Sequence, residues 1–75
     1  MTNDEVLAAL AASRNRNEAA QVYANALDML GKSSIRWLEL TDYLIARWSV
    51  SGARYIRRRG WAIHDAKIIA QSASR

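Results

Sequence analysis

Hydrophobic residues recur at spacings of three and four over most of this chain, which is the pattern of amphipathic helices. Thr2-x-x-Glu5 fits a capping box, and an apolar stripe follows at Val6, Leu7 and Leu10. We therefore predict a first helix to about residue 13. The chain has no proline and only three glycines, and no segment reads as a strand. The pattern predicts an all-α protein, a small bundle of three to four helices.

A second helix is predicted after the polar residues 13–17. Asn15-x-x-Glu18 can cap its start, and Gly31 can end it, because glycine enters the left-handed cap conformation without strain. A single kinked helix across residues 13–17 remains the alternative. The expected buried face of the second helix consists of Ala19, Val22, Tyr23, Ala26, Leu27 and Leu30.

A third helix is expected to start at Ser33 or Ser34. Its apolar residues lie around most of the circumference, which predicts a helix buried on more than one side. In so small a domain, such a helix either sits at the centre or lends one face to a partner chain. The apolar residues are Ile35, Trp37, Leu38, Leu40, Tyr43, Leu44, Ile45 and Trp48.

The third helix is predicted to end at Trp48, where a tight turn leads into a further helix. Ser49 and Gly52 loosen the backbone there, and Val50 is expected to act as an apolar plug between them. Ser51 can accept a hydrogen bond from the free N–H groups that open the next helix. The sequence therefore predicts a helical corner at residues 48–52.

The fourth helix is expected to run from after Ser51 to about Gln71, with Gly60 as its weak point. If the helix continues through Gly60, Trp61 and Ile68 share its polar face. If it breaks there, Trp61 returns to the core and residues 62–70 form a separate short helix. The pattern leaves both outcomes open.

Four arginines within six residues dominate the fourth helix: Arg54, Arg57, Arg58 and Arg59. At about 100° per residue, the first three fall within about one third of the circumference. No acidic residue occurs between Arg47 and Arg59, so salt bridges within this segment cannot explain the cluster. The apolar residues gather on the other side, at Ala53, Ile56, Gly60 and Ile63.

The 75 residues carry a net charge of +4, distributed unevenly. Residues 1–30 contain two arginines against four acids, whereas residues 31–75 contain nine basic residues against three acids.

We expect one helical domain, residues 1–75, whose small core favours a homodimer. With no cysteine and one histidine, no metal or cofactor is expected. No transmembrane segment or signal peptide is recognised, so a cytoplasmic protein is expected.

Residues 40–60 resemble the helix-turn-helix of small bacterial and phage regulators, whose turn has an apolar, a small, an apolar and a serine residue. Trp48, Ser49, Val50 and Ser51 match that turn. The resemblance implies a regulator of phage or plasmid type that binds double-stranded DNA with its second helix in the major groove. A rival turn lies at residues 30–33. The expected DNA-binding residues are Arg47, Ser51, Gly52, Arg54, Arg57, Arg58 and Arg59, with Lys32 as a further clamp on the flanking backbone.

Other functions remain open beside DNA binding. The chain could be an interaction module, such as a phage-type inhibitor that docks on an acidic host protein by its third helix or basic face. It could also lie on a membrane surface, because arginine beside tryptophan suits anionic headgroups. An enzyme is not expected, since His64 and Asp65 are neighbours that point apart on a helix, and no nucleophile pattern accompanies them.

Overall fold

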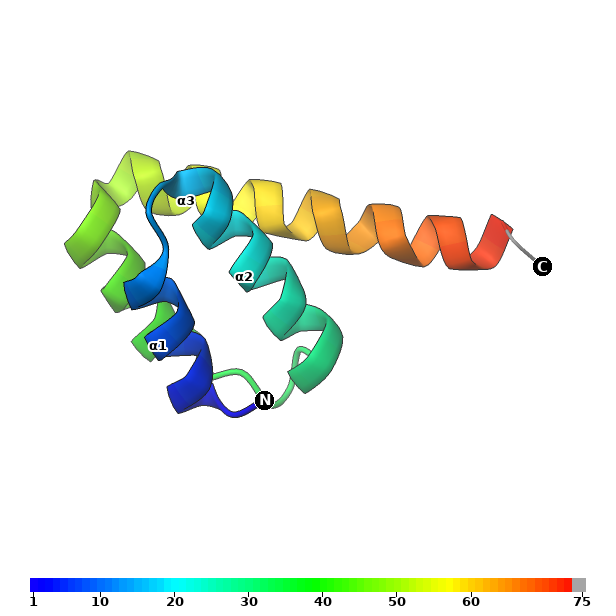
Figure 1. The fold of residues 1–75 in the computed structure, drawn as a ribbon, viewed down its shortest axis with the longest axis horizontal. Coiled ribbons are helices and arrows are strands. Elements are labelled where there is room, and N and C mark those ends of the chain that lie inside the picture. The colour runs from blue at the N-terminus through cyan, green and yellow to red at the C-terminus, as the bar shows by residue number, and fades with distance from the viewer. Residues whose placement is uncertain (74–75) are drawn as a thin grey trace.

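The computed structural model describes residues 1–73 and folds them into three α-helices without a strand. Helix α1 spans Asn3–Ala12, α2 spans Arg16–Leu30 and α3 spans Trp37–Ala73. In Figure 1, α1 and α2 lie against α3, whose C-terminal part extends beyond the other two helices. The prediction of a small all-α bundle is confirmed.

The first two helices start and end as their cap residues predict. The Thr2 hydroxyl accepts from the Glu5 N–H at 3.2 Å, and Asn15 Oδ1 accepts from the Glu18 N–H at 2.9 Å. Gly31 ends α2 with a φ of 77°. Because α1 ends at Ala12 and a new cap follows, the alternative of one kinked helix is wrong.

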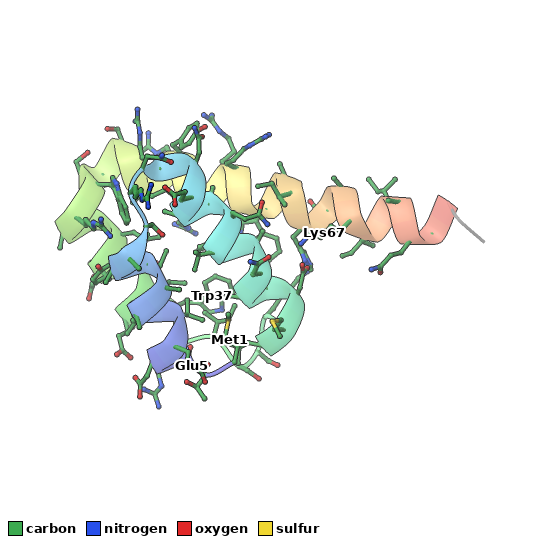
Figure 2. All side chains as sticks on the ribbon, in the orientation of Figure 1. Met1, Glu5, Trp37 and Lys67 are labelled. Carbon is green, nitrogen blue, oxygen red and sulfur yellow. The ribbon has the colours of Figure 1, made fainter. Side chains whose placement is uncertain are left out.

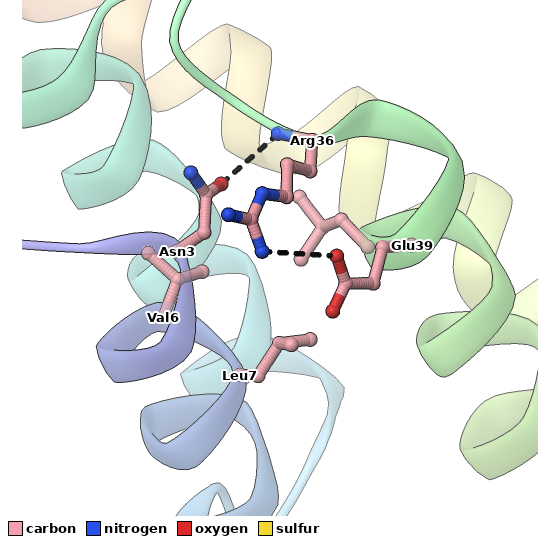
Figure 3. A pocket seen from close by; sticks show the side chains of 6 residues that line it. Asn3, Val6, Leu7, Arg36 and Glu39 are labelled. Atoms are coloured by element: carbon pink, nitrogen blue, oxygen red, sulfur yellow. Dashed lines mark hydrogen bonds and ion pairs between the residues drawn. The ribbon is translucent and has the colours of Figure 1, made fainter.

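The third helix starts later than predicted, at Trp37 rather than at Ser33 or Ser34. Residues 31–36 reverse the chain direction, and Asn3 of α1 stabilises their end. Its side-chain amide donates to the Ser34 carbonyl at 2.9 Å. Its Oδ1 accepts from the Arg36 N–H at 3.0 Å, the bond drawn between these two residues in Figure 3. A residue more than 30 positions away therefore holds the turn that precedes the first residue of α3.

Helix α3 bends at Ser49, whose φ of 66° and ψ of 176° separate two helical segments, residues 37–48 and 50–73. The corner predicted after Trp48 is present, but only Ser49 leaves helical geometry. Ser51 therefore lies inside the second helical segment and does not precede it. The Ser51 hydroxyl shares a hydrogen bond of 3.2 Å with the Ser49 hydroxyl. The prediction that Val50 plugs the corner is wrong. Val50 is 56% exposed because it opens the second segment on its outer surface.

The bend lets α3 pack against both other helices. Residues 37–48 lie beside α1, where Arg47 bonds to the end of that helix. Residues 50–64 lie beside α2, where Gly60 meets Tyr23 and His64 meets Asp28. The connection between α1 and α2 and the bend of α3 therefore lie at the same end of the molecule (Figure 1).

One hydrophobic cluster joins the three helices, and the predicted face of α2 belongs to it. Within this chain, residues 37–48 are buried on one side, so the expectation that this helix sits at the centre is wrong, and the alternative that it lends its other face to a partner chain stays a prediction. Leu40 and Leu44 are buried, but Leu38 is 84% exposed and Ile45 is 39% exposed on the opposite face. The fully buried side chains include Val6, Leu10, Tyr23, Leu44 and Ile56.

Helix α3 continues through Gly60, and Trp61 nevertheless returns to the core. The Trp61 ring stacks on Trp37 with centroids 6.1 Å apart, and the Trp37 ring also contacts Tyr23 at 6.0 Å. Figure 2 shows Trp37 in the space that the helices surround. Both alternatives were thus partly correct, because Trp61 lies at the edge of the packed face, where it can reach Trp37 without a break in the helix.

Although α3 contains 37 residues, no helix within residues 1–73 is apolar enough over a sufficient length to cross a membrane. Beyond the end of α2, residues 65–72 of α3 are exposed. They include the apolar side chains of Ile68 and Ile69.

Gly60→Ala should lower the free energy of unfolding by about 1–3 kcal/mol. A Cβ at this position would lie 2.5 Å from Cδ1 of Tyr23, which forces α2 and α3 apart. Helix propensity alone predicts the opposite sign, since alanine is favoured over glycine by about 1 kcal/mol. Urea titration measures the change, and Ala62→Gly on the exposed side of α3 measures the propensity effect separately. A more stable Gly60→Ala protein would contradict this packing.

Candidate nucleic-acid interface

The outer face of α3 just after its bend carries the arginine cluster. Arg54, Arg57, Arg58 and Arg59 are all exposed. The ion pairs found within residues 1–73 lie elsewhere, between Arg36 and Glu39 and around Asp28, so no described carboxylate neutralises the four guanidinium groups. The face is therefore a concentrated and accessible positive charge.

Arg57 lies closest to the core among these arginines. Burial raises the pKa of the Tyr23 hydroxyl, and the nearby Arg57 guanidinium opposes that shift. Arg57 therefore lies along the border where α2 meets α3.

The start of α2 adds a cation that the sequence analysis missed. The Arg16 guanidinium lies over the Tyr55 ring, 5.3 Å from its centroid, and the Tyr55 hydroxyl donates to Asn17 Oδ1 at 2.7 Å. These contacts join residues nearly 40 positions apart, and no periodicity of the sequence indicates them. Arg16 is exposed and forms no ion pair with a described carboxylate.

Lys32 lies in the turns between α2 and α3, at the end of α2 that is away from the bend, and contacts the second segment of α3 at Trp61. Its Nζ is 5.0 Å from the centroid of the Trp61 ring, and its carbonyl accepts a hydrogen bond of 2.9 Å from Trp37 Nε1. The expected role of Lys32 as a clamp on the flanking DNA backbone stays a prediction. Lys32 and Arg16 thus each contact an aromatic residue of α3.

Ser51 and Gly52, both predicted to bind DNA, differ in exposure. Ser51 is exposed beside the bend. Gly52 is buried, and a Cβ there would lie 2.6 Å from Cβ of Trp48 and 3.7 Å from Cδ of Arg16. Gly52 therefore allows close packing at the bend, and we leave it out of the candidate interface.

Arg47 also points away from the cluster, toward the C-terminal end of α1. Its guanidinium donates to the carbonyls of Leu10, Ala11 and Ser13, with a distance of 3.0 Å to the Ala11 oxygen. It lies 4.3 Å from the centroid of the Trp48 ring. The last turn of α1 contains no basic residue, so Arg47 satisfies the free carbonyls there and interacts favourably with the helix dipole. We assign Arg47 to the fold.

His64 pairs with Asp28 of α2 rather than with its sequence neighbour Asp65. Asp28 contacts His64 Nδ1 through one oxygen and Lys67 Nζ at 3.0 Å through the other. Hydrogen bonds from Lys67 and His64 lower the pKa of Asp28. This cluster fastens the end of α2 to α3. Within residues 1–73, no group of three or more histidine and acidic residues is arranged to hold a metal ion.

A small cavity lies between α1 and the start of α3 (Figure 3). Its volume is about 10 Å³, room for about one water molecule. Arg36 and Glu39 lie across its mouth, 3.6 Å apart. This cavity is too small for an organic substrate. It is lined by Asn3, Val6, Leu7, Arg36, Glu39 and Leu40.

The chain matches no protein-family model, no curated protein and no solved structure. Its function is therefore inferred from its own residues.

Arg47→Ala should lower the free energy of unfolding by about 1–3 kcal/mol, because three carbonyl groups at the end of α1 lose a charged donor. Arg58→Ala removes the same side chain from an exposed position and should change stability by less than about 0.5 kcal/mol. Thermal unfolding followed by circular dichroism compares the two variants. Equal losses of stability would contradict the separate roles of these arginines.

Asp28→Asn should destabilise the protein near neutral pH and have less effect in acid. Because the pKa of Asp28 is lowered in the folded state, its carboxylate stabilises the fold above the unfolded-state value of about 3.9. That stability is lost as the pH falls through the folded-state pKa. Urea titrations at about pH 6 and pH 2.5 measure the difference from the wild type. Asp65→Asn, which removes an exposed carboxylate outside the described ion pairs, is the matched control and should show little difference at either pH.

Proposed function

We propose that this protein binds double-stranded DNA through the outer face of α3 at residues 54–59. The observation that carries the proposal is the exposure of Arg54, Arg57, Arg58 and Arg59 without any described carboxylate partner. Clustered like charges repel one another, and a polyanion relieves that repulsion by replacing its own counterions with the arginines.

The uneven distribution of charge supports the same proposal. Four of the seven acidic residues, Asp4, Glu5, Glu39 and Asp42, are exposed on α1 and on the first segment of α3. The other three are exposed on α2, at Glu18 and Asp28, and on α3 after the arginine cluster, at Asp65. In Figure 2, Glu5 lies at the end of α1 away from the bend of α3. A polyanion is therefore attracted to the bend and repelled from the opposite end, which orients the protein as it approaches.

The shape of α3 suits a duplex. A helix with its side chains is about 10–12 Å across, and the major groove of B-form DNA is about 12 Å wide. Guanidinium groups match both phosphate oxygens and the O6 and N7 atoms of guanine. We infer a small cytoplasmic transcriptional regulator of phage or plasmid type, whose second α3 segment enters the groove as the helix-turn-helix resemblance implies.

A homodimer is part of this proposal. Leu38 and Ile45 are seven residues apart on the first segment of α3, so they share one exposed face. A second copy that covers this face would enlarge a small core and present two arginine clusters to one duplex.

The same exposed face supports the second candidate, a protein interaction module without a nucleic-acid ligand. Leu38 at 84% exposure is an apolar side chain with no cover in this chain. In that case the partner is a protein, and nuclease treatment leaves its capture unchanged. For either candidate we propose a binding role rather than a catalytic one.

A mixed-sequence DNA duplex should bind at about 50 mM salt, and its affinity should fall steeply as the salt is raised. Arg57→Ala and Arg58→Ala should each weaken binding several-fold, since each removes a contact to the duplex. Fluorescence anisotropy with a labelled duplex measures both effects. Arg36→Ala is the matched control, because it removes the same charge from the side of the molecule that carries Glu39.

The control should bind within about two-fold of the wild type after the small change in net charge. Absence of wild-type binding at low salt, or equal losses for Arg36→Ala and the two cluster variants, would sink the proposal. Circular dichroism spectra of all four proteins establish that each one is folded.

A further inference from the structure

Two aromatic residues of α3 each carry a cation from a different part of the chain. Arg16, at the start of α2, lies 5.3 Å from the Tyr55 ring centroid. Lys32, in the turns before α3, lies 5.0 Å from the Trp61 ring centroid. Arg16 and Lys32 are exposed, and no described carboxylate pairs with either. Their charged groups are thus held at the surface of α3 and remain available to a ligand.

The two aromatic residues border the arginine face on opposite sides. At about 100° per residue, Tyr55 and Trp61 lie about 120° apart around α3. Arg54 and Arg58 fall inside that sector, one helical turn apart. They form the crest of the face.

The remaining two arginines of the cluster lie just outside the sector, one on each side. Arg57 lies about 40° beyond Trp61, and Arg59 lies about 40° beyond Tyr55. Arg57 and Trp61 both lie close enough to the Tyr23 hydroxyl to lower its pKa, which agrees with their placement next to each other around α3. Each flank therefore combines a cluster arginine with a cation from elsewhere in the chain.

On the basis of the DNA-binding function proposed above, we propose that these six cations form one cradle for B-form duplex DNA. The pair Arg16 and Arg59 contacts phosphates of one strand, and the pair Lys32 and Arg57 contacts phosphates of the other strand. The crest arginines, Arg54 and Arg58, face the base edges between the two strands.

The two pairs of flanking cations lie on opposite sides of α3, and this arrangement suits the major groove of a DNA duplex. A helix seated in a groove about 12 Å wide meets one phosphate backbone on each side and the base pairs below. A single strand engages only one flank at a time. The deep major groove of A-form RNA is too narrow for a helix, so an RNA duplex cannot reach the crest.

The aromatic contacts contribute to binding by holding the flank cations in place. Long cationic side chains lose rotamer freedom when they contact a phosphate, and a ring that already restricts them reduces that loss. Arg16 and Lys32 are therefore phosphate-binding residues whose positions depend on Tyr55 and Trp61.

The flanks are tested by the salt dependence of binding to a mixed-sequence DNA duplex. Arg16→Gln and Lys32→Gln should each weaken binding to all duplexes alike and reduce the slope of log K against log salt by about 1. Glutamine keeps most of the side chain, so packing on the ring is largely preserved. Arg36→Gln is the matched control and should keep the wild-type slope.

The crest is tested with a duplex enriched by the wild-type protein from a random pool. Arg54→Ala and Arg58→Ala should reduce the preference for that duplex over a scrambled one by about 10-fold, with a smaller change in the salt slope. Binding to an RNA duplex should be weaker and insensitive to both crest variants.

The outcomes separate this inference from the proposed function. If the wild-type protein does not bind a DNA duplex at low salt, both fail. If it binds and depends on Arg57 and Arg58, but Arg16→Gln and Lys32→Gln match Arg36→Gln, the cradle is wrong and the proposed function stands. A pool without enrichment, or crest variants that keep the wild-type preference, overturns base reading by Arg54 and Arg58.

Discussion

The packing of Tyr23 against Gly60 determines how α2 crosses α3, and the rest of the structure depends on that crossing. The Tyr23 ring occupies the space that a side chain at position 60 would fill. The same ring contacts Trp37, which stacks on Trp61. With this crossing in place, the start of α2 reaches Tyr55 and the end of α2 reaches His64. The core and the candidate interface therefore share one set of contacts.

Arg47 stabilises the bend of α3. The sequence alone could not separate it from the arginines expected to bind DNA. Ser49 takes a positive φ, which is strained for a residue with a Cβ. Arg47 offsets that cost by bonding to the last carbonyls of α1, and Gly52 lets the two segments of α3 approach closely. Arg47 therefore contributes to the shape of the molecule, whereas the arginines after the bend keep their donors exposed to solvent.

The candidate interface combines local and tertiary features. The cluster from Arg54 to Arg59 is a property of one helix, and its exposure follows from the apolar residues on the other side of that helix. Arg16 and Lys32 join it only because Tyr55 and Trp61 hold their cationic groups. The arginine cluster and Arg16 lie near the bend, whereas Lys32 follows the end of α2 that is away from the bend and reaches α3 at Trp61.

The sequence by itself determined the helical class, the caps of the first two helices, the corner after Trp48 and the arginine cluster. Each is encoded in residues a few positions apart, where helical periodicity and cap hydrogen bonds act directly. Only the tertiary structure decided the late start of α3, the bonds of Arg47 to the end of α1, the burial of Gly52 and the contact of Arg16 with Tyr55. Apart from the contact of Gly52 with Trp48, these features depend on partners 30 or more residues away in the sequence. Such partners meet because the helices cross, and the spacing of residues along the sequence does not encode that crossing.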